Sequence, residues 1–303
     1  METIWRIQLK PSPREGITYE NVLSFCREEN IIGVGWEQII CKDDDYTLLK
    51  KEIEESPYEK KISTFRSINA MRMMRPGDLI WTRLGQDASE YYLCRVGNKI
   101  WKDRVITERH YDHNIIQFVS AKWIKIGKED HVPGKVINSF IPAATVQRIS
   151  DVTEVSKYIW NHYCDNIALH YNDVKERNLW DVIGSEDLEC LVLLYLQCNG
   201  YYIISSTLKK GTGKYEVAMI SHDGTHRCYP QVKRVTPLPA ENYAQRARKD
   251  EKIVLFTTSE RYGEKKYPNV ECLTKKQLEH FMRTHYSILP DNVKYWVELS
   301  EFK

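Results

Sequence analysis

Six short runs rich in β-branched and aromatic residues occupy the first half of this chain, and they constrain its fold more than any other feature. Glycine, proline and aspartate punctuate these runs, as they commonly do between strands. Two helical segments, near residues 18–29 and 46–73, interrupt them. Short strands with crossing helices predict a small, strongly bent sheet or barrel over residues 1–150. The runs are IWRIQL (4–9), IIGVGW (31–36), DLIWTRL (78–84), EYYLCRVG (90–97), IIQFVSAKWIKIG (115–127) and ATVQRI (144–149).

The pattern changes over residues 151–180, where apolar residues recur at helical spacing and a polar segment follows. The second half then alternates helices with strands. Because 303 residues exceed the size of one typical core, we expect an α+β chain of two domains, 1–150 and 181–303, joined by a helical connector. The later elements are predicted as a helix over 186–198, a strand over 201–207, a hairpin turning at Asp223-Gly224, a helix over 239–250, strands over 252–259 and 269–273, a helix from a Thr274–Gln277 capping box to His285, and a last helix over 291–300.

Composition limits the classes of function. A net charge of +2 means that any nucleic-acid surface is a local patch. Eight scattered cysteines with no Cys-x-x-Cys spacing indicate separate reduced thiols instead of a zinc site. His110, Asp112 and His113 offer metal ligands, although a surface loop is the favoured interpretation. No signal-peptide pattern and no run of eighteen apolar residues appears, so we expect a cytoplasmic protein without membrane contact.

The segment KYEVAMISHDGTHRCYPQVKRV (214–235) predicts a β-hairpin with an acid on one strand and Gln-x-Lys on the other. Residues i and i+2 of a strand share a face, so Gln231 and Lys233 point the same way. Glu216 precedes Gln231 by fifteen positions, enough for the two strands to lie side by side. Metal-assisted phosphodiester hydrolysis needs oxygen ligands for a divalent cation and a cation that places the attacking water. The alternative is a solvated cross-strand ion pair between Glu216 and Lys233.

In this context the second half resembles the Mrr-like branch of the PD-(D/E)xK nucleases, whose motif is an acid followed by Glu- or Gln-x-Lys. The resemblance implies a restriction-endonuclease-like α/β core. It implies metal binding by Glu216 and Gln231, with help from Glu189 in the helix before NGYYI, and a lysine, Lys233, that orients the water. The implied cofactor is Mg²⁺ or Mn²⁺, since magnesium prefers oxygen ligands and keeps several waters.

Two departures from the family pattern bear on whether the site is active. Glu216 stands where the family usually has Asp, so its carboxylate reaches one methylene further. Pro230 directly precedes Gln231 and lacks a ladder donor, which predicts an edge, a bulge or a kink at that point. Either departure is compatible with a rearranged site or with an inactive one.

Basic residues are in local excess around this hairpin. Between residues 209 and 234 there are six basic residues and two acids, which suits a phosphate backbone. The alternative is a solvated strand face. The residues that we predict to contact nucleic acid are Lys209, Lys210, Lys214 and Arg234.

The first half resembles the PUA-like superfamily, particularly EVE-type domains, through PGDLIW, a strand ending in RVG, AKWIKIG, and VPGKVINSF followed by ATVQRI. That resemblance implies a small barrel that holds a modified or flipped base in an aromatic pocket. A base outside the stack needs a ring against its face and polar groups on its edge. Trp36 follows a glycine-rich strand that would admit a ligand, and Trp81 shares a strand face with Arg83, so these three are the predicted ligand contacts. The alternative for each tryptophan is packing in the core.

Together the resemblances imply a nucleic-acid-binding defence or restriction-type protein. The N-terminal domain would sense a modified base or nucleotide-like ligand, and the C-terminal domain would cleave phosphodiester bonds with a metal. DNA is the expected partner, with RNA left open, and a homodimer is expected by analogy with nucleases that cut both strands. Two alternatives remain: a catalytically inactive nuclease-fold binding protein, and an interaction subunit of a defence complex.

Overall fold

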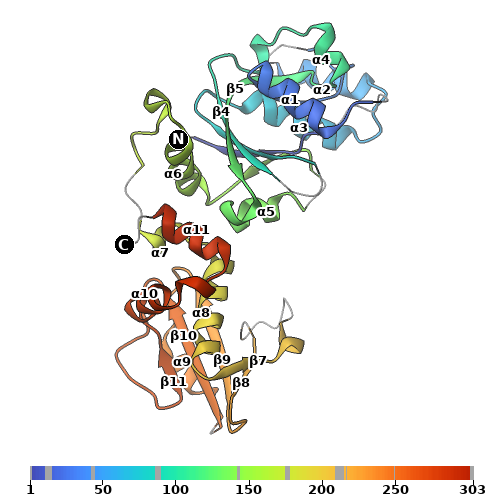
Figure 1. Cartoon of the computed structure of the whole chain (residues 1–303). Helices are drawn as coiled ribbons and strands as arrows, with labels where there is room; N and C mark the ends of the chain where they lie inside the picture. The colour runs from blue at the N-terminus through green and yellow to red at the C-terminus, as the bar shows by residue number, and fades with distance from the viewer. Residues whose placement is uncertain are drawn as a thin grey trace. The chain divides into compact units, whose positions relative to one another are not determined.

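The computed structural model describes residues 2–10, 16–41, 45–85, 90–141, 144–174, 178–208, 215, 217–248 and 250–300. The chain is α+β and contains two mixed sheets. It divides into two compact units, Met1–Glu176 and Arg177–Lys303, each of which is followed here by itself (Figure 1). The division falls within the segment where the sequence changes character.

All six strands predicted for the first half are confirmed. They form one sheet in the order β2-β5-β4-β3-β1-β6, in which β1 and β3 are parallel and the other pairs antiparallel. The strands are β1 (Ile4–Ile7), β2 (Ile31–Val34), β3 (Leu79–Arg83), β4 (Tyr91–Val96), β5 (Gln117–Gly127) and β6 (Val146–Ile149).

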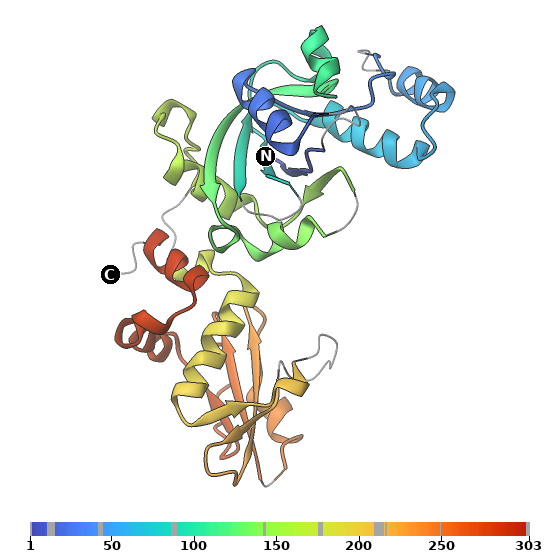
Figure 2. The ribbon, with the colours of Figure 1, turned by 45° about the vertical axis from the view of Figure 1, so that its right-hand side comes forward.

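This sheet curls into a half-barrel (Figures 1 and 2). The long strand β5 makes the bend possible because its two halves have different partners. Residues 117–120 pair with β2, and residues 121–127 pair with β4. Strands must twist and coil for a sheet to close on itself, and one strand shared between two directions of pairing is a common way to do so.

The helices of the first unit cover both faces of the sheet. The segment predicted as one helical stretch over 46–73 is two helices, because Ser56 adopts an extended conformation before Pro57, and a residue before proline disfavours the helical region. The predicted connector helix, α6, belongs to the first unit, where Ser156 accepts a hydrogen bond from Trp81. The helices are α1 (Tyr19–Glu28), α2 (Tyr46–Glu55), α3 (Lys61–Met73), α4 (Glu108–Asp112), α5 (Gly134–Ser139) and α6 (Thr153–Tyr163).

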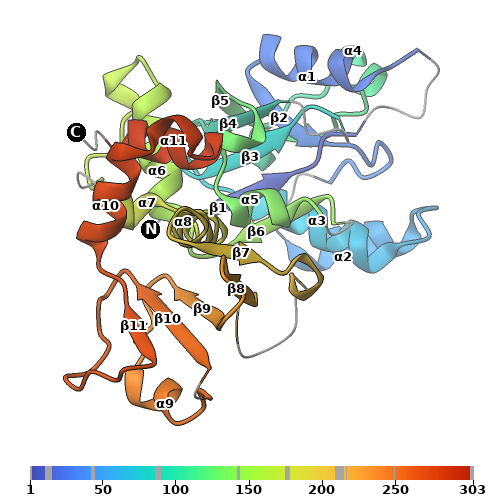
Figure 3. The ribbon, with the colours of Figure 1, turned by 60° about the horizontal axis from the view of Figure 1, so that its bottom comes forward.

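The second unit follows the predicted element order. Its sheet has the order β11-β10-β9-β8-β7; β7, β8 and β9 are antiparallel neighbours, and β10 is parallel to both β9 and β11. In Figure 3, α8 is seen nearly end-on beside β7 and β8. The elements are α7 (Leu179–Val182), α8 (Ser185–Cys198), β7 (Tyr201–Ile203), β8 (Met219–Ser221), β9 (Arg227–Lys233), α9 (Ala240–Ala244), β10 (Glu251–Thr257), β11 (Val270–Cys272), α10 (Lys275–Thr284) and α11 (Asp291–Leu299).

Local signals explain the boundaries that the sequence predicts well and those that it does not. The Thr274–Gln277 capping box and the turn at Asp223-Gly224 are both present, the latter with Gly224 at φ 72°. Strand β7 is shorter than predicted, because the Thr207 hydroxyl donates to the Ile204 carbonyl and turns the chain into a 3₁₀ helix. No helix within the described residues is long and apolar enough to cross a membrane.

Candidate functional site

Trp36 projects from the end of β2, where the chain leaves the sheet. Its backbone lies in the left-handed region at φ 69°, which is uncommon for a large side chain. The ring is half-buried and packs partly against the core of the first unit. The sequence predicted that the glycines before Trp36 admit a ligand, but neighbouring segments of the fold fill the space beside Gly33 and Gly35. A Cβ on Gly33 would lie 2.4 Å from the Gln117 carbonyl oxygen, and one on Gly35 would lie 2.4 Å from the Asn114 side chain.

Trp36 lines a groove of about 950 Å³ in the first unit. One wall is the start of α3, where no side chain caps the first turn, so backbone N–H groups of that turn are available to a ligand. Another wall is the start of β6 with Gln147, whose amide oxygen accepts from Arg6 at 2.8 Å. The charged lining residues are Lys10, Lys60, Lys61, Arg66 and Glu59. The groove therefore combines an aromatic ring, an open helix N-terminus and an excess of positive charge, which are the features that bind an anionic, flat ligand.

Trp81 is a core residue, which was the alternative to its role as a ligand contact. Its ring is fully buried, and the indole Nε1 donates to the Ser156 hydroxyl at 2.9 Å. No face of this ring is left for a base to stack on, so its prediction as a ligand contact is wrong. Arg83 lies on the same strand face, as predicted, but its guanidinium sits 4.8 Å from the centre of the Phe140 ring. Arg6 stacks on the same ring at 5.2 Å.

Buried positive charge is a feature of this region. Burial, together with the charge of Arg83, lowers the pKa of Arg6 to about 10. The Arg6 guanidinium is held by carbonyl oxygens of Ala144 and Ser139, which lie beside the groove wall. Arg83 thus helps to pack the sheet against Phe140, and the structure does not bring it to Trp36 as a ligand contact.

Some of the candidate nuclease residues of the second unit lie within the described residues. Strand β9 presents Gln231 and Lys233 on one face, paired in register with Leu255 and Thr257 of β10. Gln231 is buried and Lys233 is half-buried. Pro230 pairs with Val254 without a register shift, and within the described residues β8 pairs only with Arg227 and Cys228 of β9. Of the predicted options, the bulge is not found in the pairing of β9 with β10, whose register runs unshifted through Pro230.

Glu189 lies one turn into α8, a helix that packs against β7 and β9. The Arg234 guanidinium donates to the Asp181 carbonyl at the end of α7, which ties the last residues of β9 to the segment just before α8. Glu189 and Lys233 thus come from neighbouring ends of two packed elements. Arg234 is half-buried by this contact, so part of its hydrogen-bonding capacity is used within the fold.

Four predicted site residues lie outside the described residues: Glu216, Lys209, Lys210 and Lys214. Among the residues that are described, no three His, Cys, Asp or Glu side chains gather where they could hold a metal ion. The candidate metal ligand that is described, Gln231, offers an amide oxygen, a donor that suits magnesium.

The remaining sequence candidates have structural roles. His110 is buried, stacks on Phe118 with ring centres 4.6 Å apart, and places Nδ1 2.7 Å from the Thr107 hydroxyl. Burial lowers its pKa. His113 stacks on Phe25. The eight cysteines are all free, as their spacing predicts, and burial raises the pKa of Cys228 to about 12.

Comparisons with family models, with curated proteins and with solved structures find no match for this chain.

Proposed function

We propose that this chain is a nucleic-acid-binding defence or restriction-type protein that senses a base or nucleotide-like ligand in the Trp36 groove and cleaves phosphodiester bonds with its second unit. The observation that carries the proposal is the groove itself, in which a half-buried tryptophan faces an uncapped helix start and four basic side chains. A ring supplies sequence-tolerant stacking, and cations with backbone N–H groups supply phosphate binding.

The curled sheet of the first unit supports the PUA-like, EVE-type interpretation of residues 1–150. The resemblance rests on short strands that bend into a barrel, and the six-stranded half-barrel, with Trp36 two residues beyond the end of β2, is compatible with it. A freed base stacked on Trp36 would place its phosphate toward the start of α3, where the helix dipole favours negative charge.

The element order of the second unit supports the Mrr-like interpretation of residues 181–303. Helix α8 precedes three antiparallel strands; the third carries Gln231 and Lys233, and α9 follows. In this proposal Gln231, Glu216 and Glu189 would hold Mg²⁺ or Mn²⁺, which stabilises charge on the phosphate when it is bound. The half-buried ammonium of Lys233 would orient the attacking water and contact the phosphate oxygens.

Binding is tested by fluorescence anisotropy with labelled single-stranded oligonucleotides, DNA and RNA, unmodified and carrying methylated bases. Trp36→Ala should weaken binding by about fivefold or more, because stacking of one base is worth about 1–3 kcal/mol. Tyr46→Ala is the matched control, since it removes an exposed ring of the same unit that does not line the groove. Equal affinities for Trp36→Ala and the unaltered protein would refute the groove as the reader.

Cleavage is tested separately, with modified and unmodified plasmid in the presence of Mg²⁺ or Mn²⁺. Lys233→Ala and Gln231→Ala should each lower the rate by about a hundredfold or more, as loss of a group that stabilises transition-state charge does. Lys276→Ala removes an exposed lysine of α10 and should leave the rate unchanged. Cleavage that survives in Lys233→Ala contradicts the nuclease assignment.

Binding without metal-dependent cleavage would favour the alternative, an inactive nuclease-fold protein that grips nucleic acid. The burial of Gln231 supports this alternative, because the buried amide would have to move before its oxygen could bind a metal. In that case Glu216→Gln should leave function unchanged. Light scattering of the full chain with and without a DNA duplex tests the proposed homodimer.

A further inference from the structure

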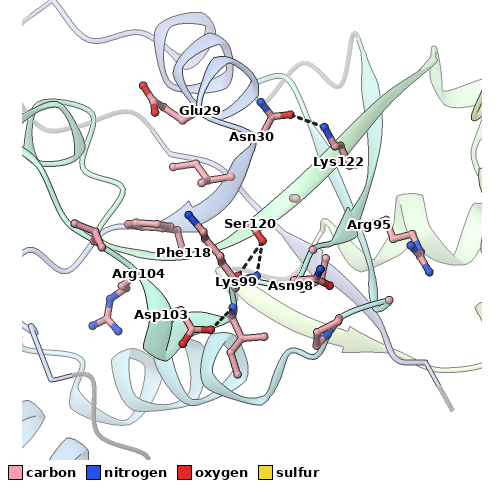
Figure 4. A pocket seen from close by; sticks show the side chains of 18 of the residues that line it. Glu29, Asn30, Arg95, Asn98, Lys99, Asp103, Arg104, Phe118, Ser120 and Lys122 are labelled. Carbon is pink, nitrogen blue, oxygen red and sulfur yellow. Dashed lines mark hydrogen bonds between the residues drawn. The ribbon is translucent and has the colours of Figure 1, made fainter. Parts of the chain in front are cut away.

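A second cavity lies in the first unit, away from the Trp36 groove. Its volume is about 700 Å³, within the range of sites that bind small organic ligands. It is built where β2 and β5 meet the loop that follows β4, and none of the residues lining the Trp36 groove lines it. Figure 4 shows Arg95, Lys99 and Lys122 around this space, with Ser120 between Lys99 and Lys122.

Two of these cations come from paired positions of the sheet. Arg95 of β4 and Lys122 of β5 are directly opposite partners of an antiparallel pair. Side chains at such positions share a face with Cβ atoms about 4.5–5.5 Å apart, and like charges there destabilise the sheet. Within the described residues neither side chain has a carboxylate partner: Arg95 stacks on the Tyr171 ring at 4.9 Å, and Lys122 reaches the Asn30 amide oxygen at 3.5 Å.

The third cation is fixed beside them by the backbone. The amide of Lys99 donates to the Ser120 hydroxyl at 3.0 Å, and the amide of Ser120 donates to the Lys99 carbonyl at 2.8 Å. Gly97 lies so close that a Cβ there would be 2.7 Å from the Ser120 hydroxyl oxygen. The loop is therefore clamped onto β5, while the Lys99 side chain stays exposed and has no ion-pair partner in the described part of the chain.

The acids of the cavity are already engaged. Glu29 forms an ion pair with Arg109, and the Asp103 carboxylate accepts from the Ile100 amide at 3.0 Å. Arg104 is buried and donates to the carbonyls of Ile116 and Trp101, so it adds positive charge at the cavity wall, which the Glu52 carboxylate offsets in part. The floor is apolar and includes Phe118.

We propose that this cavity binds a small phosphate-bearing ligand of nucleotide size, with its phosphate held by Arg95, Lys99 and Lys122 and its uncharged part on the apolar floor beside Phe118. An anion would relieve the repulsion between Arg95 and Lys122, and charge-assisted bonds to phosphate are the strongest available to these groups. The ligand site is separate from the base-reading groove and does not depend on the proposed function of that groove. The first unit would then have a second binding site, which takes a free nucleotide.

The test is isothermal titration calorimetry of the full chain with AMP, with inorganic phosphate, with adenosine and with a single-stranded oligonucleotide. AMP should bind at least about tenfold more tightly than either fragment, because the site has both a phosphate-binding part and an apolar part. Lys99→Gln/Lys122→Gln should weaken AMP about tenfold or more. Lys128→Gln, which removes an exposed lysine just after β5, should leave AMP affinity within about twofold.

Hydrogen exchange with AMP should slow at residues 97–100 and 120–122 and not at residues 60–64. Because Lys122 is exposed and its ammonium makes only a 3.5 Å contact with Asn30, Lys122→Gln should not lower the melting temperature, which separates loss of binding from loss of folding. The proposal would be overturned if AMP showed no saturable binding, whether or not the oligonucleotide binds. It would also be overturned if Trp36→Ala removed AMP binding and the lysine variant did not.

Discussion

Trp81 and Ser156 are joined by a hydrogen bond of 2.9 Å between the indole Nε1 and the serine hydroxyl, and both side chains are fully buried. The bond fixes α6 against the sheet of the first unit. Ser156→Ala leaves the indole donor buried without an acceptor, so it should lower the free energy of unfolding by about 1–3 kcal/mol. Urea unfolding measures this, and oligonucleotide affinity should not change. If Ser156→Ala lowered oligonucleotide affinity but not the free energy of unfolding, Trp81 would have to be considered a ligand contact after all.

Gly33 lets β2 approach β5 more closely than any other residue would. Gly33→Ala places a Cβ 2.4 Å from a backbone carbonyl oxygen, which cannot move without breaking the ladder. We expect destabilisation at the upper end of the range for overpacking, about 3 kcal/mol. Gly200→Ala is a useful comparison, since its Cβ would meet nothing within 4 Å and only its φ of 97° penalises the change. A smaller loss for Gly33→Ala than for Gly200→Ala would contradict this account.

Trp36 has a backbone conformation that favours glycine. At φ 69°, an L-residue costs about 1–2 kcal/mol relative to glycine. Trp36→Gly and Trp36→Ala both remove the ring, so both should lose ligand binding. Trp36→Gly should nevertheless be more stable than Trp36→Ala by about 1 kcal/mol, as measured by chemical denaturation. Equal stabilities would show that this residue relaxes to another conformation in solution.

His110 makes the first unit sensitive to mild acid. Burial lowers its pKa below the usual value of 6.5, so the unfolded chain binds a proton that the folded chain resists. The stability that neutral His110 contributes should therefore be fully present above about pH 6.5. It should decline as the pH falls through that value toward the lowered pKa. His110→Phe keeps the stacking on Phe118 and should lose less stability between pH 7.5 and pH 5.5 than the unaltered protein. Hydrogen exchange of β2 and β5 assigns the effect to the first unit, and an unchanged pH dependence would contradict the assignment.

Asp187 anchors α11 to the start of α8 in the second unit. Its carboxylate accepts from the indole of Trp296 at 2.7 Å and from the Asn292 amide. Burial raises the pKa of Asp187 even with these donors. Asp187→Ala leaves both donors without an acceptor and should cost about 2–3 kcal/mol. Asp187→Asn keeps one acceptor oxygen and should cost less; the reverse order, measured by urea unfolding, would rule out this anchoring role.

The sequence by itself determined the local elements. All six strands of the first unit, the Thr274–Gln277 cap and the turn at Asp223-Gly224 follow from period, β-branching and turn chemistry, which act within a few residues. It also determined that Gln231 and Lys233 share a face, because alternation along a strand is fixed by backbone geometry.

Only the tertiary structure decided which side chains stay accessible. Trp36 and Trp81 both stand in strand-like runs of the sequence. One lines a groove and the other is fully buried against α6, because exposure depends on segments distant in the sequence. The pairing of Arg95 with Lys122 is likewise set by strand register. Lys99 is placed near them by a hydrogen bond to Ser120, a residue twenty-one positions away. Long-range pairing sets these relationships, and no window of neighbouring residues contains them.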